Sequence, residues 1–506
     1  MLAAADVQPG RALPWLREQL GRFDDAQIDQ LLEWLLVQPP PAAGSPRDQL
    51  WAGLFMELAG RWADSRPPAD GEPPSMGIRR QIAGLYAALD PASRARPALL
   101  EALTARGDLQ EFARLVVADP PTDPATSARP FVRLLGRTGW NGEDLFPALL
   151  EGLGQPAVAV PILELANFLA RERRLVPHPA SARRHELGRL LSGLAGGLAR
   201  MQDLPDPAAA SADDVLRVHA AVDLAVALCD ALGLIGDPAL AAKLYPVLEL
   251  QHRRLRTEAA AALARLDDQH GREVLAALAA EPMTRLRVLE YAQQLGIEDR
   301  IEERFRTPQA MAEARLAVWL SQPDQLGMPP DRLELVDSRR QCWPGFRAPV
   351  ACYLFRFSVP LPHARYENLG IAGPMVGAFA GDVSELPTSD VYAAFAGWQA
   401  DHPEIAQRDC AALDPETRER CAARVRQLEQ SGYESVRPVI WGEFFGQQAL
   451  VAAAVRGETP GTAIVGEQGI DWIARGNPLR PIEPPLAWSI AKGRQLLRAF
   501  NPPGQG

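Results

Sequence analysis

Apolar residues recur three and four positions apart in the first part of the chain. Between residues 49 and 62 they form two interleaved rows, Leu50, Leu54 and Leu58 beside Trp51, Phe55 and Trp62. This spacing puts one continuous apolar face on a helix. Shorter patterns predict helices at 13–20 and 25–37. We therefore expect an N-terminal helical cap over residues 1–66, followed by a proline-rich linker at 65–77, where a helix cannot propagate.

Helical patterns separated by short breaks then continue through the middle of the chain. The helices that they predict span 78–89, 95–106, 109–117, 128–136, 144–152, 158–173 and 182–201. Their spacing is irregular, which is typical of degenerate helical pairs. Further helices are expected up to residue 319, and the proline-rich stretch 322–330 closes the array.

The clearest repeat lies between residues 236 and 296. Leu255-Arg256 leads into the apolar helix 259–266, and Leu286-Arg287 leads into 289–295, 31 positions further on. A period of this length, with two amphipathic helices in each unit, is typical of helical-pair solenoids, because each pair buries its apolar face against the next. The fold predicted for residues 78–330 is an α-solenoid.

These residues resemble HEAT repeats, in particular the short bacterial type called phycobilisome-lyase HEAT-like repeats. The likeness covers about residues 215–300 and rests on Glu281-Pro282 before Arg287, and on Arg256 before an Ala/Leu face. The first unit departs from the pattern, since Leu250 stands where the second unit has its acid. A tetratricopeptide-like or irregular helical array is the alternative, because such motifs are degenerate.

The resemblance implies a scaffold or adaptor whose concave face binds a protein or peptide partner. Arg256, Glu281 and Arg287 are the candidates for a ladder between repeats. A minority of the family is linked to chromophore attachment, for which this sequence offers no support of its own. No catalytic residue is carried over from the resemblance.

Residues 331–506 have a different pattern, with aromatic and β-branched residues in short runs between glycines. These runs predict strands at 348–359, 437–445, 448–456, 462–466 and 470–474. The glycine-containing breaks favour an antiparallel meander. Helical patterns occupy 388–399, 416–430 and 485–500, and we expect the last helix to cover one sheet face. The prediction is a smaller α+β domain that resembles no family.

Composition and charge narrow the functional classes. The 506 residues are 47% hydrophobic, which is ample for extensive cores, and the net charge is −10 with a pI of about 5.4. Such an acidic chain lacks the positive field that captures phosphates, so no nucleic-acid partner is expected. Five sparse cysteines argue against a disulfide framework, and no targeting segment or uncharged apolar span is found. We expect a cytoplasmic protein with no membrane partner.

Candidate chemistry is confined to the C-terminal part. Gly370, Gly373, Gly377 and Gly381 could form a ligand-contacting loop beside Asp382, although glycines more often serve tight turns. Glu443 and Asp471 flank an aromatic set and could form an acid/base pair only in a shared cleft.

Two further motifs are weaker. Ser489 and Lys492 spell Ser-x-x-Lys without the rest of that constellation. Cys410 and Cys421 near His402, or Cys342 and Cys352, could assemble a zinc site, although isolated cysteines usually behave as buried apolar residues. We therefore expect no metal and no cofactor.

Two hypotheses follow from the sequence. The leading one is an interaction scaffold built on a HEAT-like solenoid, without a catalytic constellation. The alternative is an enzyme or small-molecule-binding protein with its site in the α+β domain near the glycine loop 370–381.

Overall fold

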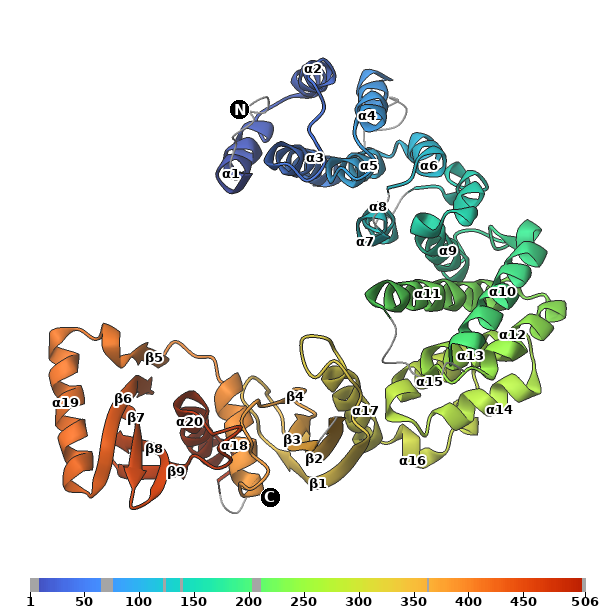
Figure 1. The fold of residues 1–506 in the computed structure, drawn as a ribbon. Coiled ribbons are helices and arrows are strands. Elements are labelled where there is room, and N and C mark those ends of the chain that lie inside the picture. The colour runs from blue at the N-terminus through green and yellow to red at the C-terminus, as the bar shows by residue number, and fades with distance from the viewer. Residues whose placement is uncertain are drawn as a thin grey trace. The chain divides into compact units, whose positions relative to one another are not determined.

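A computed structural model describes residues 9–64, 76–121, 124–136, 140–202, 211–361 and 364–502 of the chain. Helices account for 59% of the structure, and the strands lie in two antiparallel sheets near the C-terminus (Figure 1). The mainly α class with a C-terminal antiparallel α+β part is thus confirmed. Residues 65–75 of the expected linker lie outside the described residues.

The chain divides into two compact units, Met1–Leu275 and Ala276–Gly506. The boundary lies inside helix α14 (Gln269–Leu278), well before the change of sequence character at residue 331.

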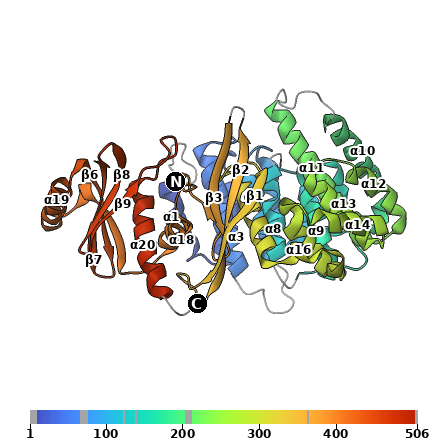
Figure 2. The same cartoon turned by 90° about the horizontal axis from the view of Figure 1, so that it is seen from below.

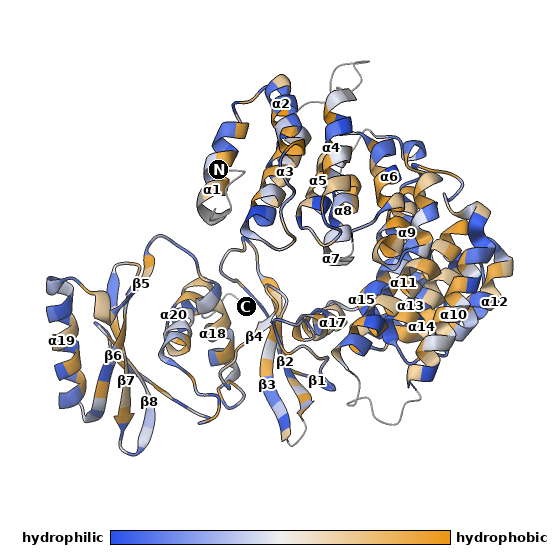
Figure 3. Cartoon of the chain, turned by 45° about the horizontal axis from the view of Figure 1, so that its top comes forward, coloured by the Kyte–Doolittle hydropathy of each residue, from blue (hydrophilic) through white to orange (hydrophobic). Residues whose placement is uncertain are grey.

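The first unit consists of helices. In chain order, with η for a 3-10 helix, they are α1 (Pro9–Leu20), α2 (Asp25–Leu36), α3 (Pro46–Asp64), α4 (Met76–Ala88), α5 (Ala95–Arg106), α6 (Leu109–Ala118), α7 (Pro124–Ser127), α8 (Arg129–Gly136), η1 (Gly142–Asp144), η2 (Ala148–Gly154), α9 (Pro156–Arg171), η3 (Ser181–Arg183), α10 (Arg184–Gln202), α11 (Ala212–Ile235), η5 (Pro238–Leu240), α12 (Ala241–Leu248), α13 (Arg253–Arg265) and the start of α14. Helices α9 and α11 are mainly hydrophobic (Figure 3).

Many helices in this unit pack on the second helix further along the chain. Helix α3 packs on α1 and on α5, α8 packs between α5 and α9, and α11 packs between α9 and α13. Helices α2, α4 and α6 contact one another in the same successive way. These helices therefore bury apolar side chains against helices that are close to them in the chain.

One predicted α-helix has a different form. Residues 144–152 lie in η1, a turn and η2 rather than in one α-helix. Pro147 lacks the N–H that an α-helix needs, and Gly142 and Gly152 add backbone freedom. A 3-10 helix forms in short pieces, so it can form in a stretch that proline and glycine interrupt.

A buried polar network joins α9, α11 and α13. Asp230 accepts from both Arg171 and Arg265, the second at 2.9 Å. Asn167, also buried, donates to the carbonyl of Ala227 at 3.0 Å and meets Nε2 of His178 at 3.0 Å. These contacts, together with the ion pair of Arg254 with Asp223 at 2.6 Å, help to fix the register of the three helices.

Helix α11 is the one described helix long and apolar enough, by composition, to cross a membrane. Half of its apolar window is buried within the structure. A single helix of this kind is weak evidence for a membrane span, because a buried core helix can have the same length and composition.

The second unit contains both sheets. Its elements are the end of α14, α15 (Pro282–Leu295), η6 (Glu298–Arg300), α16 (Glu303–Arg306), α17 (Pro308–Leu320), β1 (Arg332–Gln341), β2 (Val350–Leu361), β3 (Ala364–Ala372), β4 (Gly377–Ala378), α18 (Thr388–Gln399), β5 (Ile405–Asp409), η7 (Cys410–Ala412), α19 (Pro415–Gln430), β6 (Tyr433–Phe444), β7 (Gln447–Arg456), β8 (Thr459–Gly466), β9 (Gly469–Ala474) and α20 (Pro484–Phe500). Sheet A has the order β1-β2-β3-β4 and sheet B the order β5-β6-β7-β8-β9.

Helices and sheets stack in layers in this unit, with α18 and α20 between the two sheets (Figures 1 and 2). Helix α17 packs on one face of sheet A through Leu316, Phe355 and Phe357, and α18 packs on the other face through Phe395. Helix α20 covers the inner face of sheet B through Trp488, and α19 covers the outer face. The expectation that the last helix covers a sheet face is confirmed.

The second unit contains the same arrangement twice. Helix α17, the meander β1–β4 and helix α18 form one half, and α19, the meander β6–β9 and α20 form the other. The halves meet where α18 and α20 cross. A Cβ on Gly397 would lie 1.9 Å from the carbonyl oxygen of Ser489, and a Cβ on Gly493 would lie 1.8 Å from that of Ala393. The contact is reciprocal, and only glycine fits at either position.

Candidate functional site

The glycine loop is a packed junction. Gly370 lies in β3, where a Cβ would meet Leu316 at 3.0 Å and the carbonyl of Gly377 at 3.2 Å. Gly373 has φ +129°, and its Cβ would meet the carbonyl of Ala351 at 2.1 Å. These glycines allow close backbone packing in sheet A, as the structural interpretation of the motif predicts.

Asp382 connects this junction to residues 477–480, which precede α20. Its carboxylate accepts from Arg480 and from Asn477, each at 2.9 Å, and from the Ser384 hydroxyl at 2.6 Å. Burial acts to raise the pKa of Asp382, but these hydrogen bonds and the charge of Arg480 lower it below its usual value. Because its carboxylate oxygens accept hydrogen bonds from protein groups, Asp382 stabilises the fold.

Glu443 and Asp471 lie on opposite faces of sheet B. Side chains alternate along a strand, so Glu443 shares the α19 face with Trp441, two positions before it. Asp471 shares the α20 face with Ile473, two positions after it. Strands β7 and β8 also separate the two carboxylates. The structure does not bring them into the shared cleft that an acid/base pair requires.

Asp471 lines a half-open cavity of about 420 Å³ between sheet B and the second half of α20. Its walls come from the turns joining β6 to β7 and β8 to β9, from β9, and from one side of α20. The volume lies within the range of small-ligand sites. The polar side chains around it are Gln447, Gln448, Glu467, Gln468, Asp471, Arg494, Gln495 and Arg498.

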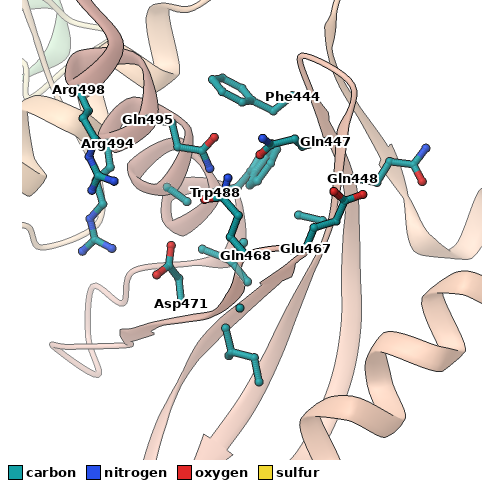
Figure 4. Close-up of a pocket in the computed structure, with 16 residues that line it drawn as sticks. Phe444, Gln447, Gln448, Glu467, Gln468, Asp471, Trp488, Arg494, Gln495 and Arg498 are labelled. Atoms are coloured by element: carbon teal, nitrogen blue, oxygen red, sulfur yellow. The ribbon is translucent and has the colours of Figure 1, made fainter. Parts of the chain in front are cut away.

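Arg494 is fixed at the wall of this cavity by α18. Its guanidinium makes a bidentate pair with Asp390, with N–O distances of 2.7 and 2.8 Å. The hydrogen bonds to Asp390 raise the pKa of Arg494, and the Asp471 carboxylate adds to this increase. In Figure 4 Asp471 lies on the same side of the cavity as Arg494 and Arg498. Arg498 is exposed, and no described residue forms an ion pair with it.

Trp488 gives the cavity an aromatic wall. It is only 2% exposed, and a Cβ on Gly442 would lie 2.4 Å from its Cζ2 atom, so β6 approaches the indole ring closely. The buried indole nitrogen has no acceptor within the part of the chain that the structure describes. Buried donors are normally satisfied, so an unpaired one beside a polar cavity is a candidate ligand contact.

The Ser-x-x-Lys motif is part of the same helix. Ser489 donates to the carbonyl of Pro485 at 3.1 Å, within its own helix. Lys492 is buried, with its ammonium 5.8 Å from the centre of the Trp488 ring, and burial lowers its pKa. Both side chains therefore make contacts that stabilise the fold.

Three glutamine side chains at the cavity are available for a ligand. Gln447, Gln468 and Gln495 form no side-chain hydrogen bond within the described residues, whereas Gln448 accepts from Arg420 at 3.0 Å. Figure 4 shows Gln448 directed away from the others. Each free carboxamide offers one acceptor oxygen and two N–H donors.

The repeat-ladder candidates lie on different helices. Arg256 lies half-buried in α13, Glu281 is the N-cap of α15, and Arg287 on α15 donates to Glu290 and Tyr291 of the same helix, at 2.9 and 2.6 Å. The anchoring arginine of this region is Arg285. It is 2% exposed and donates to the carbonyls of Ala279, Ala280 and Ala310, at 2.8, 3.0 and 2.7 Å.

The possible zinc ligands are only partly brought together. Cys410 and Cys421 line one cavity, but the ring of His402 lies on Phe445, with centroids 5.0 Å apart. Among the described residues no group of three His, Cys, Asp or Glu side chains could hold a metal.

Sequence reasoning found one residue of the cavity, Asp471, and missed Trp488, Arg498 and the glutamines. The signal available was weak: glutamines at 447, 448 and 468, beside the first and third turns of the predicted meander, which lie at the same end of it. Glutamine carries no charge and belongs to no catalytic motif, so its type alone does not indicate a site.

No protein-family model, no curated protein and no solved structure matches this chain.

Proposed function

We propose that this protein is an interaction protein whose C-terminal unit binds a polar peptide segment of a partner in the cavity beside α20. The observation that carries the proposal is the set of unused hydrogen-bonding groups at one half-open cavity. Gln447, Gln468 and Gln495 offer carboxamides, and Trp488 offers a buried N–H without an acceptor. Carboxamides complement peptide groups, which also carry one donor and one acceptor each.

The charged residues at the cavity indicate which side chains the bound peptide should carry. Arg494 is neutralised by Asp390, so Arg498 is the cation at the cavity rim that remains for a partner. A carboxylate on the peptide would pair with Arg498, and a donor beside it would pair with Asp471. The proposed ligand is therefore an extended segment that contains an acidic residue.

The proposal includes a role for the helical unit as a HEAT-like α-solenoid that supplies a second protein-binding surface. Its support is the succession in which α3, α5, α8, α9 and α11 each pack on the next. In a solenoid each repeat contacts only its neighbours, which produces this order.

The test uses a defined probe. Peptides that bind the full chain are selected from a displayed library of random heptapeptides, and their affinities are measured by isothermal titration. Arg498→Ala should weaken binding of the selected peptide about tenfold, because one charge-assisted hydrogen bond is lost. Arg347→Ala removes an exposed arginine far along the chain from the cavity and should leave affinity unchanged.

Equal affinities of the Arg498→Ala and wild-type proteins, for every acidic peptide selected, would contradict the proposal. A loss of affinity in Arg347→Ala as well would show that net charge rather than the cavity governs binding.

A further inference from the structure

The two cysteines of the α19 region form a thiol pair. Cys410 lies in the 3-10 turn η7, and Cys421 lies in α19, eleven positions later. Both line a cavity of about 370 Å³ together with Arg418 and Arg426. Cys421 is 6% exposed and belongs to the apolar cluster under α19, and Cys410 packs against the same cluster.

The two side chains lie at the same cavity and influence each other's titration. Burial raises the pKa of both thiols, that of Cys410 to about 12. The interaction between the two side chains adds to this increase at Cys410 and counteracts it at Cys421. Of the two, Cys421 is therefore the better nucleophile, since the thiolate is the reactive form.

The backbone around the pair is held in place. Asp414 caps α19, accepting from the backbone N–H of Thr417 at 2.9 Å and from its hydroxyl at 2.7 Å. Arg418 donates to the carbonyl of Leu413 at 2.8 Å, inside the loop that separates the cysteines. The loop thus keeps both thiols at one cavity.

We propose that Cys410 and Cys421 are a redox-sensitive pair that closes to a disulfide when a peroxide enters the cavity. The Cys421 thiolate attacks one peroxide oxygen, the O–O bond breaks, and the departing hydroxide takes a proton to leave as water. The sulfur of Cys410 then attacks the sulfur of the Cys421 sulfenic acid. Hydroxide leaves and takes the Cys410 proton, so one hydrogen peroxide is reduced to two waters and two thiols are oxidised to one disulfide.

The other cysteines provide controls within the same chain. Cys229 and Cys352 are buried, and Cys342 is half-buried beside Asn501, which accepts from its backbone N–H at 2.7 Å. A reagent that oxidised thiols by exposure alone would act on Cys342 as readily as on Cys410.

The experiment is a peptide map of the full chain after treatment with hydrogen peroxide. Free thiols are alkylated at low pH, and the protein is digested with trypsin without reduction. Cleavage after arginine gives Asp409–Arg418 and Cys421–Arg424 as separate peptides. The expected product is these two peptides joined, two hydrogen atoms lighter than their sum, with free thiols falling from five to three.

Recovery of both peptides separately alkylated, under conditions that oxidise Cys342, would overturn the proposal. In a Cys410→Ser variant, Cys421 should stop at the sulfenic acid and react with dimedone. If that variant does not fold, the map of the wild-type chain decides the question alone.

Discussion

Gly397 and Gly493 determine how closely α18 and α20 approach each other. Each faces a backbone carbonyl of the other helix, so an added methyl group has no flexible neighbour to displace. Overpacking against backbone forces the helices apart and opens the clusters on both sheets.

Gly397→Ala should therefore destabilise the second unit by about 3 kcal/mol in a denaturant titration. The matched control is Gly466→Ala, where the Cβ meets nothing within 4 Å and φ is ordinary. Equal stability of the two variants would show that the helices have room to separate.

His178 makes the stability of the first unit depend on pH. Burial lowers its pKa from an ordinary value of 6.5 to about 4. Its Nδ1 atom accepts from the backbone N–H of Ala180 at 3.1 Å, so the folded state requires a neutral ring. Between these two values the unfolded chain binds the proton and the folded chain does not, so stability falls as pH decreases.

We expect His178 to contribute a loss of about 3 kcal/mol between pH 6.5 and pH 4. Urea titrations of the wild type and of His178→Gln, at several pH values in this window, isolate the contribution as the difference in slope. Parallel slopes for the two proteins would contradict it.

The site residues were less predictable than the fold, because the type of a residue does not reveal which groups surround its side chain in the folded protein. Asp382 and Asp471 are equally acidic in the sequence, yet Asp382 accepts three side-chain hydrogen bonds inside the fold, while Asp471 lines a cavity. The cavity is assembled from three stretches between residues 444 and 498, and only their tertiary packing brings them together.

At the scale of elements, periodicity predicted the helices well. The helices expected at 95–106 and 388–399 have those bounds in the structure. Strands β1, β3, β4 and β5 were not predicted. Edge strand β1 carries Arg332, Glu334 and Asp337. Charged residues protect a sheet edge from pairing with other chains, but here they obscure the alternation of apolar and polar residues that would predict a strand. Strand β3 contains Gly370, which was assigned to the glycine loop.

Arg285 illustrates how one side chain joins elements. It connects the α14–α15 turn to α17 through three carbonyls and pairs with Glu313 at 2.5 Å. Removing it leaves buried carbonyls and a carboxylate without their donor.

Arg285→Met should cost about 3 kcal/mol of unfolding free energy. Arg287→Met, two positions away on the same helix, should cost less, about 1 kcal/mol, because Arg287 and its ion-pair partner Glu290 are both about half exposed. Chemical denaturation of both variants tests the difference, and a larger loss for Arg287→Met would restore it as the anchor of this repeat.

At the scale of the whole molecule, the two units support different parts of the proposal. The first unit supplies successive helix packing, and the second supplies a polar cavity with unused hydrogen-bonding groups. The sequence could not predict the cavity, because a cavity depends on how closely α20 approaches sheet B.

The most direct test of the central claim is amide hydrogen exchange of the full chain with and without a selected acidic peptide. Binding at the cavity should slow exchange in 464–471 and 488–498, and Arg498→Ala should show no such change at the same peptide concentration. Protection confined to residues 1–275, with these two segments unchanged, would contradict it and assign binding to the helical unit.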